Sequence, residues 1–523
     1  MRLPCAMRSS RAEPTVASDT DFAPDKRLHP LSWLFVLLAS IRQFIVPLIA
    51  VFVFGARDDG SAFGALFVIP LVLAAVWRQF LYRYGFGPRG LVIRDGLFFR
   101  NVRQIEYERI ENIDTQRSLL HRLMNVAEVR LESSTGGKPE ALIRVLGVDA
   151  VQELRDRVFG STRHAQAADE RTARAAQETV LLRLSPAELM RYGFVDNRGM
   201  LVVAAAFGAL SQTGVMRGAG RVLQEQIFTQ AAAAAFGISL VLVAAGLFLT
   251  IFLFVRLLSL AWALVALHDF TLTRHGADLR IRYGLLTRVG LTLRLPRIQA
   301  VHQSESMLHR FFGRVSLAVD LAGDGGQRVD ENGSPQLRMR WLAPICTPRR
   351  AAELLRVVLP MLATDTEPQW QSLAPGARGR IFRKVTALST LVLAAPAIYW
   401  LGVAAPLLWV VIVPLAWLHA SQYVRRTHWA LTREALFFQR GWLTRRLSVV
   451  PRNRVQVVHQ IVSPFDRRQA MATVVVDTAG AGAISGVVRI AYLPRAAARS
   501  LAEDLYVSAQ ELVARREAAE QPG

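Results

Sequence analysis

The sequence contains little cysteine and almost no lysine. Its two cysteines, Cys5 and Cys346, are too few for a disulfide framework or a zinc site. Only three of the 63 basic residues are lysines, so arginine supplies almost all of the positive charge behind the net +22. This bias is typical of a GC-rich bacterial genome. Residues 1–30 lack an apolar core, so we expect no cleaved signal peptide.

Motifs for chemistry are also missing. The sequence shows no glycine-rich phosphate loop, nucleophile elbow or zinc-binding helix motif. His302 and His459 have no further ligand at metal-binding spacing, and the acidic loop 324–332 lacks the spacing of an EF-hand. We therefore expect no enzymatic activity, no metal site and no cofactor.

Three long apolar blocks alternate with highly charged segments. They cover residues 31–81, 199–267 and 385–420, and the third contains no charged residue. A single helix over that third block would be about 54 Å long, whereas a hydrocarbon core is about 30 Å thick. It is therefore predicted to form a hairpin that breaks near Gly402. The same reasoning for all three blocks predicts about six spans in three pairs: 34–55, 62–81, 199–216, 234–255, 385–402 and 404–420.

One arginine lies within these spans and another directly follows one of them. Arg42 lies in the first span, which leaves open an interfacial helix over residues 31–41 followed by a shorter span. Arg256 follows the fourth span, and the apolar run 257–267 either extends that span or lies at the interface. An ionisable residue within the membrane is a hint of function. Arg42 and Arg256 are therefore the candidate intramembrane polar residues.

Cations are distributed unevenly around the blocks. The expected hairpin turns hold only Arg57, Arg217 and Arg221. The opposite flanks hold Lys26, Arg27, Arg78, Arg83, Arg191, Arg198, Arg380, Arg383, Lys384, Arg425 and Arg426. The positive-inside rule places these flanks and both termini in the cytoplasm of a bacterial inner-membrane protein. The positive charge then requires no nucleic-acid partner, and we expect none.

A repeat fills the charged segments. Residues 279–323 align without gaps to residues 436–480, and 16 of the 45 aligned positions are identical. The shared core reads Arg-Ile-Gln-Ala-Val-His-Gln from residue 297 and Arg-Val-Gln-Val-Val-His-Gln from residue 454. Downstream matches are Ser306 with Ser463, Arg310 with Arg467, and a final Val-Asp-x-Ala-Gly. The chain is thus built from a repeating unit of two spans and one domain.

A third and more divergent repeat lies upstream, at residues 91–122. It shares Arg109-Ile110 and Ser-Leu-Leu-His-Arg at 118–122 with the second repeat, but carries Glu111, Asp114 and Thr115 where the others have Gln, His and Gln. Apolar and polar residues alternate over 315–321 and 127–132, which predicts half-buried strands. Turns are expected at Gly96, Gly284 and Gly441. A closing helix is expected at 150–159, 348–359 and 494–505.

These features resemble the bacterial pleckstrin-homology-like membrane proteins, also called membrane-flanked domain proteins of the YdbT type. The resemblance rests on the paired spans, the Arg-[Ile/Val]-Gln-x-Val-x-Gln motif with its downstream Ser and Arg, and the final Val-Asp-x-Ala-Gly. It implies membrane α-helical spans plus three small β-rich domains, each a bent antiparallel sheet with a carboxy-terminal helix. It implies no particular activity.

The expected organisation follows the chain in order. We expect a tail (1–30), membrane pair one (31–83), domain one (84–162), a linker with a juxtamembrane helix (163–198), membrane pair two (199–267), domain two (268–362), a linker (363–384), membrane pair three (385–420), domain three (421–508) and a second tail (509–523).

The motif residues form the candidate interaction site. They are Arg297, Gln299, His302, Gln303 and Arg310 in the second repeat, Arg454, Gln456, His459, Gln460 and Arg467 in the third, and Arg122 in the first. Two interpretations stay open. Either they form a polar surface for a partner or for anionic headgroups, or they satisfy backbone groups at a strand-to-helix junction.

The sequence favours a membrane-anchored interaction or scaffold protein. Its cytoplasmic domains would bind partner proteins or anionic lipid headgroups. The alternative is a transporter or lipid-handling protein with a polar path among the spans, supported by Arg42, Arg256 and the prolines of the apolar blocks.

Overall fold

A computed structural model describes residues 26–27, 32, 35, 77, 81–88, 90–95, 101–133, 141–166, 179–196, 237–322, 340–363, 367–478 and 487–520. The chain divides into two compact units. One comprises Met1–Glu111, Leu123–Val129 and Leu142–Gln166, and the other comprises the remaining residues. Each unit is described below by itself.

The first unit contains an antiparallel sheet in the order β1-β2-β3-β4. Its strands are β1 (Lys26–Arg27), β2 (Arg83–Phe86), β3 (Gly90–Asp95) and β4 (Asn101–Glu106). Helix α4 (Val148–Gln166) also belongs to this unit and buries Leu154 completely. Lys26 on β1 forms an ion pair with Glu153 on α4 at 2.9 Å, which ties the segment before the first apolar block to the helix.

Strands β5 (Ile110–Arg117), β6 (Val126–Ser133) and β7 (Ala141–Gly147) follow β4 in the first repeat. The alternation expected over 127–132 is confirmed, because Val129 and Leu131 are fully buried while Glu128 and Arg130 are only partly covered.

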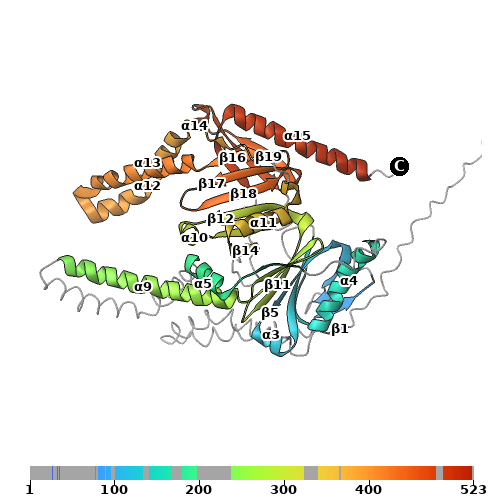
Figure 1. The fold of residues 1–523 in the computed structure, drawn as a ribbon. Coiled ribbons are helices and arrows are strands. Elements are labelled where there is room, and N and C mark those ends of the chain that lie inside the picture. The colour runs from blue at the N-terminus through green and yellow to red at the C-terminus, as the bar shows by residue number, and fades with distance from the viewer. Residues whose placement is uncertain are drawn as a thin grey trace, which may run out of the picture. The chain divides into compact units, whose positions relative to one another are not determined.

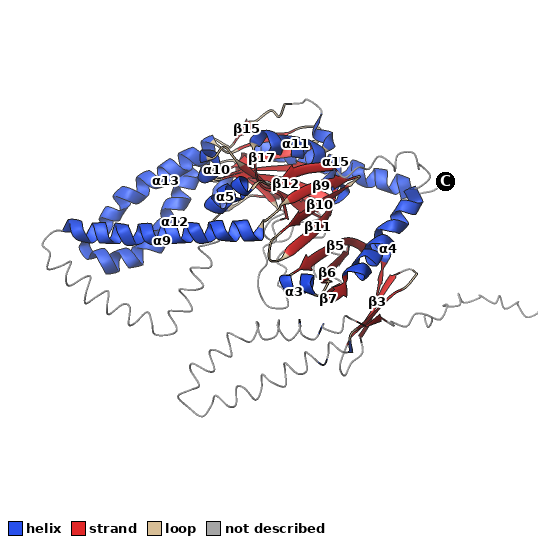
Figure 2. Ribbon diagram, turned by 60° about the horizontal axis from the view of Figure 1, so that its bottom comes forward, coloured by secondary structure: helices blue, strands red, loops and turns tan. Residues whose placement is uncertain are grey.

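The second and third repeats have matching strands. In the second repeat these are β8 (Thr179–Arg183), β9 (Thr271–His275), β10 (Asp278–Tyr283), β11 (Arg288–Arg294), β12 (Ile298–Glu305), β13 (Val315–Leu321) and β14 (Arg340–Cys346). In the third they are β15 (Gln371–Ser372), β16 (His428–Leu431), β17 (Ala435–Arg440), β18 (Arg445–Pro451), β19 (Val455–Ile461), β20 (Met471–Thr478) and β21 (Val488–Pro494). Figure 2 shows the strands of these repeats, in red, lying next to one another as sheets.

Tight turns join the strands where glycine was expected. Gly284 connects β10 to β11 with a φ of 109°, and Gly441 connects β17 to β18 with a φ of 88°. A Cβ at Gly284 would lie 2.0 Å from the carbonyl oxygen of Thr287, so only glycine fits. Gly96 lies outside the described residues.

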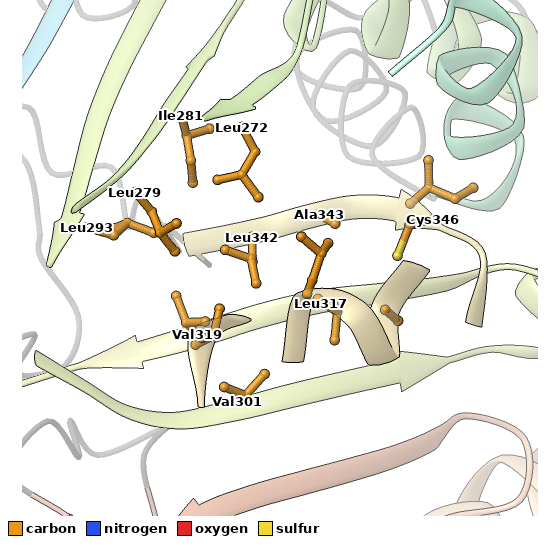
Figure 3. Packing of buried hydrophobic residues seen from close by; sticks show 14 of the residues in the cluster. Leu272, Leu279, Ile281, Leu293, Val301, Leu317, Val319, Leu342, Ala343 and Cys346 are labelled. Carbon is orange, nitrogen blue, oxygen red and sulfur yellow. The ribbon is translucent and has the colours of Figure 1, made fainter. Parts of the chain in front are cut away.

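Helices close the repeats as predicted. Helix α11 (Pro348–Val358) ends the second repeat, and α15 (Arg495–Glu520) ends the third. Helix α15 is longer than expected, because it continues past residue 505 through most of the expected tail 509–523. On α11, Ala351, Leu354 and Val358 are buried on one face. Figure 3 shows the core that this helix and the strands enclose, with Leu317 and Val319 of β13 facing Leu342 and Ala343 of β14.

The alternation expected over 315–321 is only partly right. Strand β13 forms, but Ser316 and Ala318 are as buried as the apolar residues between them. The reason for Ser316 is that the ring of His309 covers it, with 2.7 Å between Nε2 and Oγ. His309 belongs to the short helix α10 (Met307–Phe311), which begins at the capping residue Ser306. Ser463 caps α14 (Pro464–Arg467) in the same way, so the conserved spacing of these serines in the repeats has a structural reason.

Two long helical segments extend from the sheets (Figure 1). One is α9 (Gly237–Ala266), and the other is a hairpin of α12 (Ala377–Leu401) and α13 (Leu408–Arg425). The expected break at Gly402 is confirmed, since α12 ends there and the glycine has a φ of 52°.

Within the described residues, two stretches are long and apolar enough to cross a membrane: Phe248–Ala266 and Ala405–Arg425. They overlap the expected spans 234–255 and 404–420. Helix α9 runs without a break from Gly237 through Arg256 to Ala266, so the apolar run after Arg256 continues the same helix as the expected fourth span. Residues 385–401 of the expected span 385–402 belong to α12. The spans 34–55, 62–81 and 199–216 lie almost entirely outside the described residues, so six spans remain a prediction.

Candidate functional site

The motif residues gather where one repeat joins the next. Strand β12 of the second repeat pairs antiparallel with β18 of the third (Figure 1). The sheet therefore runs without interruption in the order β14-β13-β12-β18-β17-β16-β15. His302 lies opposite Ser448 and Glu305 opposite Arg445. Two repeats that are separated in sequence by the α12–α13 hairpin thereby form one sheet.

The same junction occurs once more within the second unit. Strand β5 pairs with β11, with Thr115 opposite Gly290 and Arg117 opposite Arg288. When the repeats are aligned, Arg117 corresponds to Glu305 and Arg288 to Arg445. The two junctions therefore have an identical register, although their side chains differ. Gly290 is suited to this position because an added Cβ would lie 2.9 Å from Oγ1 of Thr115.

At each junction, an arginine of one repeat donates hydrogen bonds to the backbone of the next repeat. Arg310 of the second repeat donates from Nη2 to the carbonyl oxygens of Trp442, at 2.8 Å, and Leu443, at 3.0 Å. Arg122 of the first repeat donates from Nη1 to the carbonyl oxygen of Leu285 at 3.2 Å. Arg122 and Arg310 are equivalent in the repeats, and so are Leu285 and Trp442. The retained arginine thus binds the hairpin turn of the following repeat.

A polar cluster of His302, Asp320 and Ser448 lies at the junction that Arg310 stabilises. The ring of His302 is 2.7 Å from Oδ2 of Asp320 through Nε2, and 2.9 Å from Oγ of Ser448 through Nδ1. The side chains of His302 and Asp320 are only 13% and 14% exposed, so this contact is largely shielded from water. Arg446 lies on β18, two residues before Ser448. Burial and, to a smaller extent, the positive charge of Arg440 lower the pKa of Arg446, and the negative charge of Asp320 partly offsets this shift.

The other motif residues of the second repeat bind their own backbone. Arg297 donates to the carbonyl oxygen of Ala322 at 2.6 Å, and Gln299 donates to that of Arg297 at 3.3 Å. Gln299 is buried and sits at an irregularity in the pairing of β12 with β13. Gln303 is half-buried opposite Leu447 of β18.

The third repeat presents the same residues differently. Gln456, His459 and Gln460 on β19 are exposed, as is Arg467 at the end of α14, while Arg454 is half-buried. Gln456 lies at the same pairing irregularity as Gln299. Among the described residues, β19 pairs with β20 and with no counterpart of β18.

The intramembrane candidates are separate from this cluster. Arg256 on α9 donates to the carbonyl oxygen of Phe194 at 2.9 Å, and its guanidinium lies over the rings of Phe194 and Phe252. Phe194 belongs to α5 (Pro186–Val195), which lies in the segment 163–198 where a juxtamembrane helix was expected. Arg42 lies outside the described residues.

Sequence reasoning missed one strong contact. Glu188 on α5 binds Arg314, which directly precedes β13, through Oε1 to Nη2 at 2.8 Å and Oε2 to Nε at 3.0 Å. The hydrogen bonds from Arg314 hold the pKa of Glu188 below its usual value. The sequence carried one local signal for Glu188. Ser185, which caps α5, lies three residues before it, and this spacing is typical of a helix start.

Comparison with known proteins agrees with this architecture. The bacterial PH domain family matches residues 34–162, 226–343 and 385–508, which together make up most of the chain. The chain is 24% identical over 470 residues to the UPF0699 transmembrane protein YdbT of Bacillus subtilis (strain 168), covering 86% of this chain and 92% of that protein. No solved structure gives a significant match. The chain therefore belongs to the bacterial PH domain family, as a membrane-associated member of the YdbT type with three successive copies of the domain.

Proposed function

We propose that the protein is a multi-pass inner-membrane scaffold whose PH-like domains face the cytoplasm and bind partners there. The observation that carries this proposal is the continuous sheet across β12 and β18. It makes two repeats into one broad surface instead of two independent modules. A binding role requires no catalytic group, and broad β-surfaces with open edges are recognised by extended segments of partner proteins.

Rigid contacts between helices and sheets support a scaffold. Helix α5 packs against α9 so closely that a Cβ on Gly193 would lie 2.8 Å from Cα of Leu260. The Glu188–Arg314 pair then links α5 to the second repeat. In the third repeat, Arg380 on α12 pairs with Asp466 on α14 at 3.5 Å. Each described membrane helix or hairpin is thus held to its own sheet, which fixes the sheet's orientation at the membrane.

The base of the α12–α13 hairpin favours an anionic, cytoplasmic leaflet. Arg383 and Lys384 are exposed there. Arg378 lies 4.7 Å from the ring of Trp417, which also packs edge-on against Phe382. Aromatic rings and cations at one level are typical of the membrane–water interface, and each cation near an anionic leaflet contributes about 1 kcal/mol. Headgroup contact would therefore assist membrane placement.

The transporter alternative has less support. Arg256 engages the backbone and rings of α5, so its described contacts are structural and do not line a polar path.

Topology mapping and binding assays test the proposal. Reporter fusions after residues 58, 220 and 403 should report the periplasm, and fusions at both termini should report the cytoplasm. Purified full-length protein in nanodiscs, used as bait against the cytoplasmic fraction, should retain specific proteins. A periplasmic signal at either terminus would overturn the topology, and an Arg256→Ala variant that lost a transport phenotype while retaining every bound protein would favour the alternative.

A further inference from the structure

Two of the strands that lie at sheet ends among the described residues are equivalent to strands that form the junctions. Strand β19 lies at one end of the sheet β19-β20-β21, and β4 lies at one end of the sheet β1-β2-β3-β4. By the alignment of the repeats, β19 corresponds to β5 and β12, and β4 corresponds to β11 and β18. These are the two kinds of edge that pair at both internal junctions. Within the described residues, each junction edge is therefore used twice and left open once.

The open edges are exposed and partly apolar. On β19, Val457 is 43% and Ile461 is 46% exposed, and on β4 Val102 is 63% exposed. The equivalent strand β12 is buried over its first four residues. A groove of about 510 Å³ also runs beside β19, between Val458 and Gln460 on the strand and Arg499 and Tyr506 on α15. Exposed edges of this kind are usually blocked in proteins that stay monomeric.

The third repeat carries the equivalents of the junction residues. Arg467, the equivalent of Arg122 and Arg310, is exposed and donates its side chain to no described residue. Asp477, the equivalent of Asp320, has a buried Oδ1 without a hydrogen-bond partner among the described residues. His459, the equivalent of His302, is exposed. The third repeat thus has the side chains that form a junction elsewhere in the chain, and they lie at an exposed strand edge.

We propose that β19 of one molecule pairs antiparallel with β4 of a second molecule, so that the protein self-assembles head to tail through a third junction of the same kind. The partner is a second copy because, within the described residues, β5 and β12 both pair across a junction with an equivalent of β4. The register of the internal junctions places His459 opposite Arg103 and Gln460 opposite Val102.

The charges suit this pairing. Arg103 on β4 is exposed and would lie on the same face as His459 and Asp477, since cross-strand neighbours share a face. Its guanidinium can then reach the unpartnered carboxylate oxygen of Asp477. Arg467 would face the β3–β4 hairpin of the second molecule, as Arg310 faces the β17–β18 hairpin within the chain. Apolar Val102 and Ile461 would be removed from water.

Such an interface is heterologous, because the two molecules contribute different edges. A heterologous contact leaves one edge of each kind free and so adds further molecules in a row or a ring. The pairing requires only that both molecules present their domains on one membrane face. It does not depend on which other protein the proposed scaffold binds.

Disulfide trapping in membranes tests the pairing. Two tagged chains are co-expressed in a Cys5→Ser background, one with Val102→Cys and the other with Gln460→Cys. Cys346 is left in place because burial raises the pKa of its thiol to about 12 and keeps it unreactive. Mild oxidation should give several-fold more heterodimer than a control pair of Val102→Cys with Val180→Cys, another exposed strand residue. A single chain with Gln303→Cys and Leu447→Cys shows that the oxidation traps this type of pair.

Edge variants separate specific pairing from collision. Ile461→Pro and Arg103→Glu should each reduce the heterodimer several-fold, and Arg103→Glu with Asp477→Arg should restore part of it. If no heterodimer forms while the Gln303–Leu447 control does, the proposal is wrong. It is equally wrong if the Val180 control gives as much heterodimer, or if a single chain that carries both Val102→Cys and Gln460→Cys forms the disulfide while the two separately tagged chains do not.

Discussion

Arg310 and Trp442 are joined across two repeats by a hydrogen bond of 2.8 Å from the guanidinium to the backbone carbonyl. Because the acceptor is main chain, the contact does not depend on which side chain occupies the turn. This explains why Leu285 can take the place of Trp442 at the preceding junction while the arginine is retained. The retained motif therefore has a structural use at the junctions, and its exposed third version remains available for a partner.

Replacing Arg310 should loosen the second junction. Arg310→Ala removes two charge-assisted hydrogen bonds, and we expect a loss of about 1–2 kcal/mol, seen as a lower melting temperature of the full chain in detergent. Arg467→Ala is the matched control, because the same repeat position is exposed in the third repeat. Equal effects from both variants in the monomer would contradict the assignment of Arg310 to the junction.

Removing the imidazole of His302 should also destabilise the junction. His302→Ala leaves the carboxylate of Asp320 shielded without its partner, which costs about 1–3 kcal/mol. The double variant with Asp320→Ala should lose less than the sum of the two single variants, as measured in a thermal-unfolding cycle. His459→Ala serves as the control at an exposed site. Strict additivity would mean that the two groups do not interact.

Glycine at residue 470 should stabilise the third repeat. Ala470 has a φ of 48°, and the equivalent residues Asn125 and Gly313 have values of 52° and 60°. Alanine in this left-handed region is strained, so Ala470→Gly should raise stability by about 0.5–1 kcal/mol. Ala497→Gly in α15 is the control and should lower stability by about 1 kcal/mol. A destabilising Ala470→Gly would contradict the strain argument.

Acid should weaken the second repeat through His309. Burial lowers the pKa of this histidine, although nearby Asp196 raises it in part. The folded state therefore favours the neutral ring, whereas the unfolded chain takes up a proton near pH 6.5. The contribution of the neutral ring to the free energy of unfolding should be fully present above that pH, and it should be lost as the pH falls below it. The melting temperature of His309→Gln should depend less on pH between 7 and 5 than that of the parent chain, and His275→Gln should behave like the parent.

Local patterns were sufficient for much of the fold. Apolar run length and the glycine at residue 402 predicted the α12–α13 hairpin, and turn chemistry predicted Gly284 and Gly441. Alternation failed at Ser316, because a covering histidine from α10 replaced solvent. The positions of the motif residues could be found from the repeats, but their partners could not. Ser448 and Trp442 lie well over a hundred residues beyond His302 and Arg310, and nothing local specifies which edges pair.

The sequence alone determined the threefold repetition, the apolar blocks and the arginine-rich character, since each depends on composition and spacing along the chain. Only the tertiary structure decided that β12 pairs with β18 and β5 with β11, and that β19 and β4, among the described residues, form no such junction. The physical reason is that a strand edge offers the same backbone groups whatever its side chains, so the choice of partner depends on which edges the folded sheets bring together.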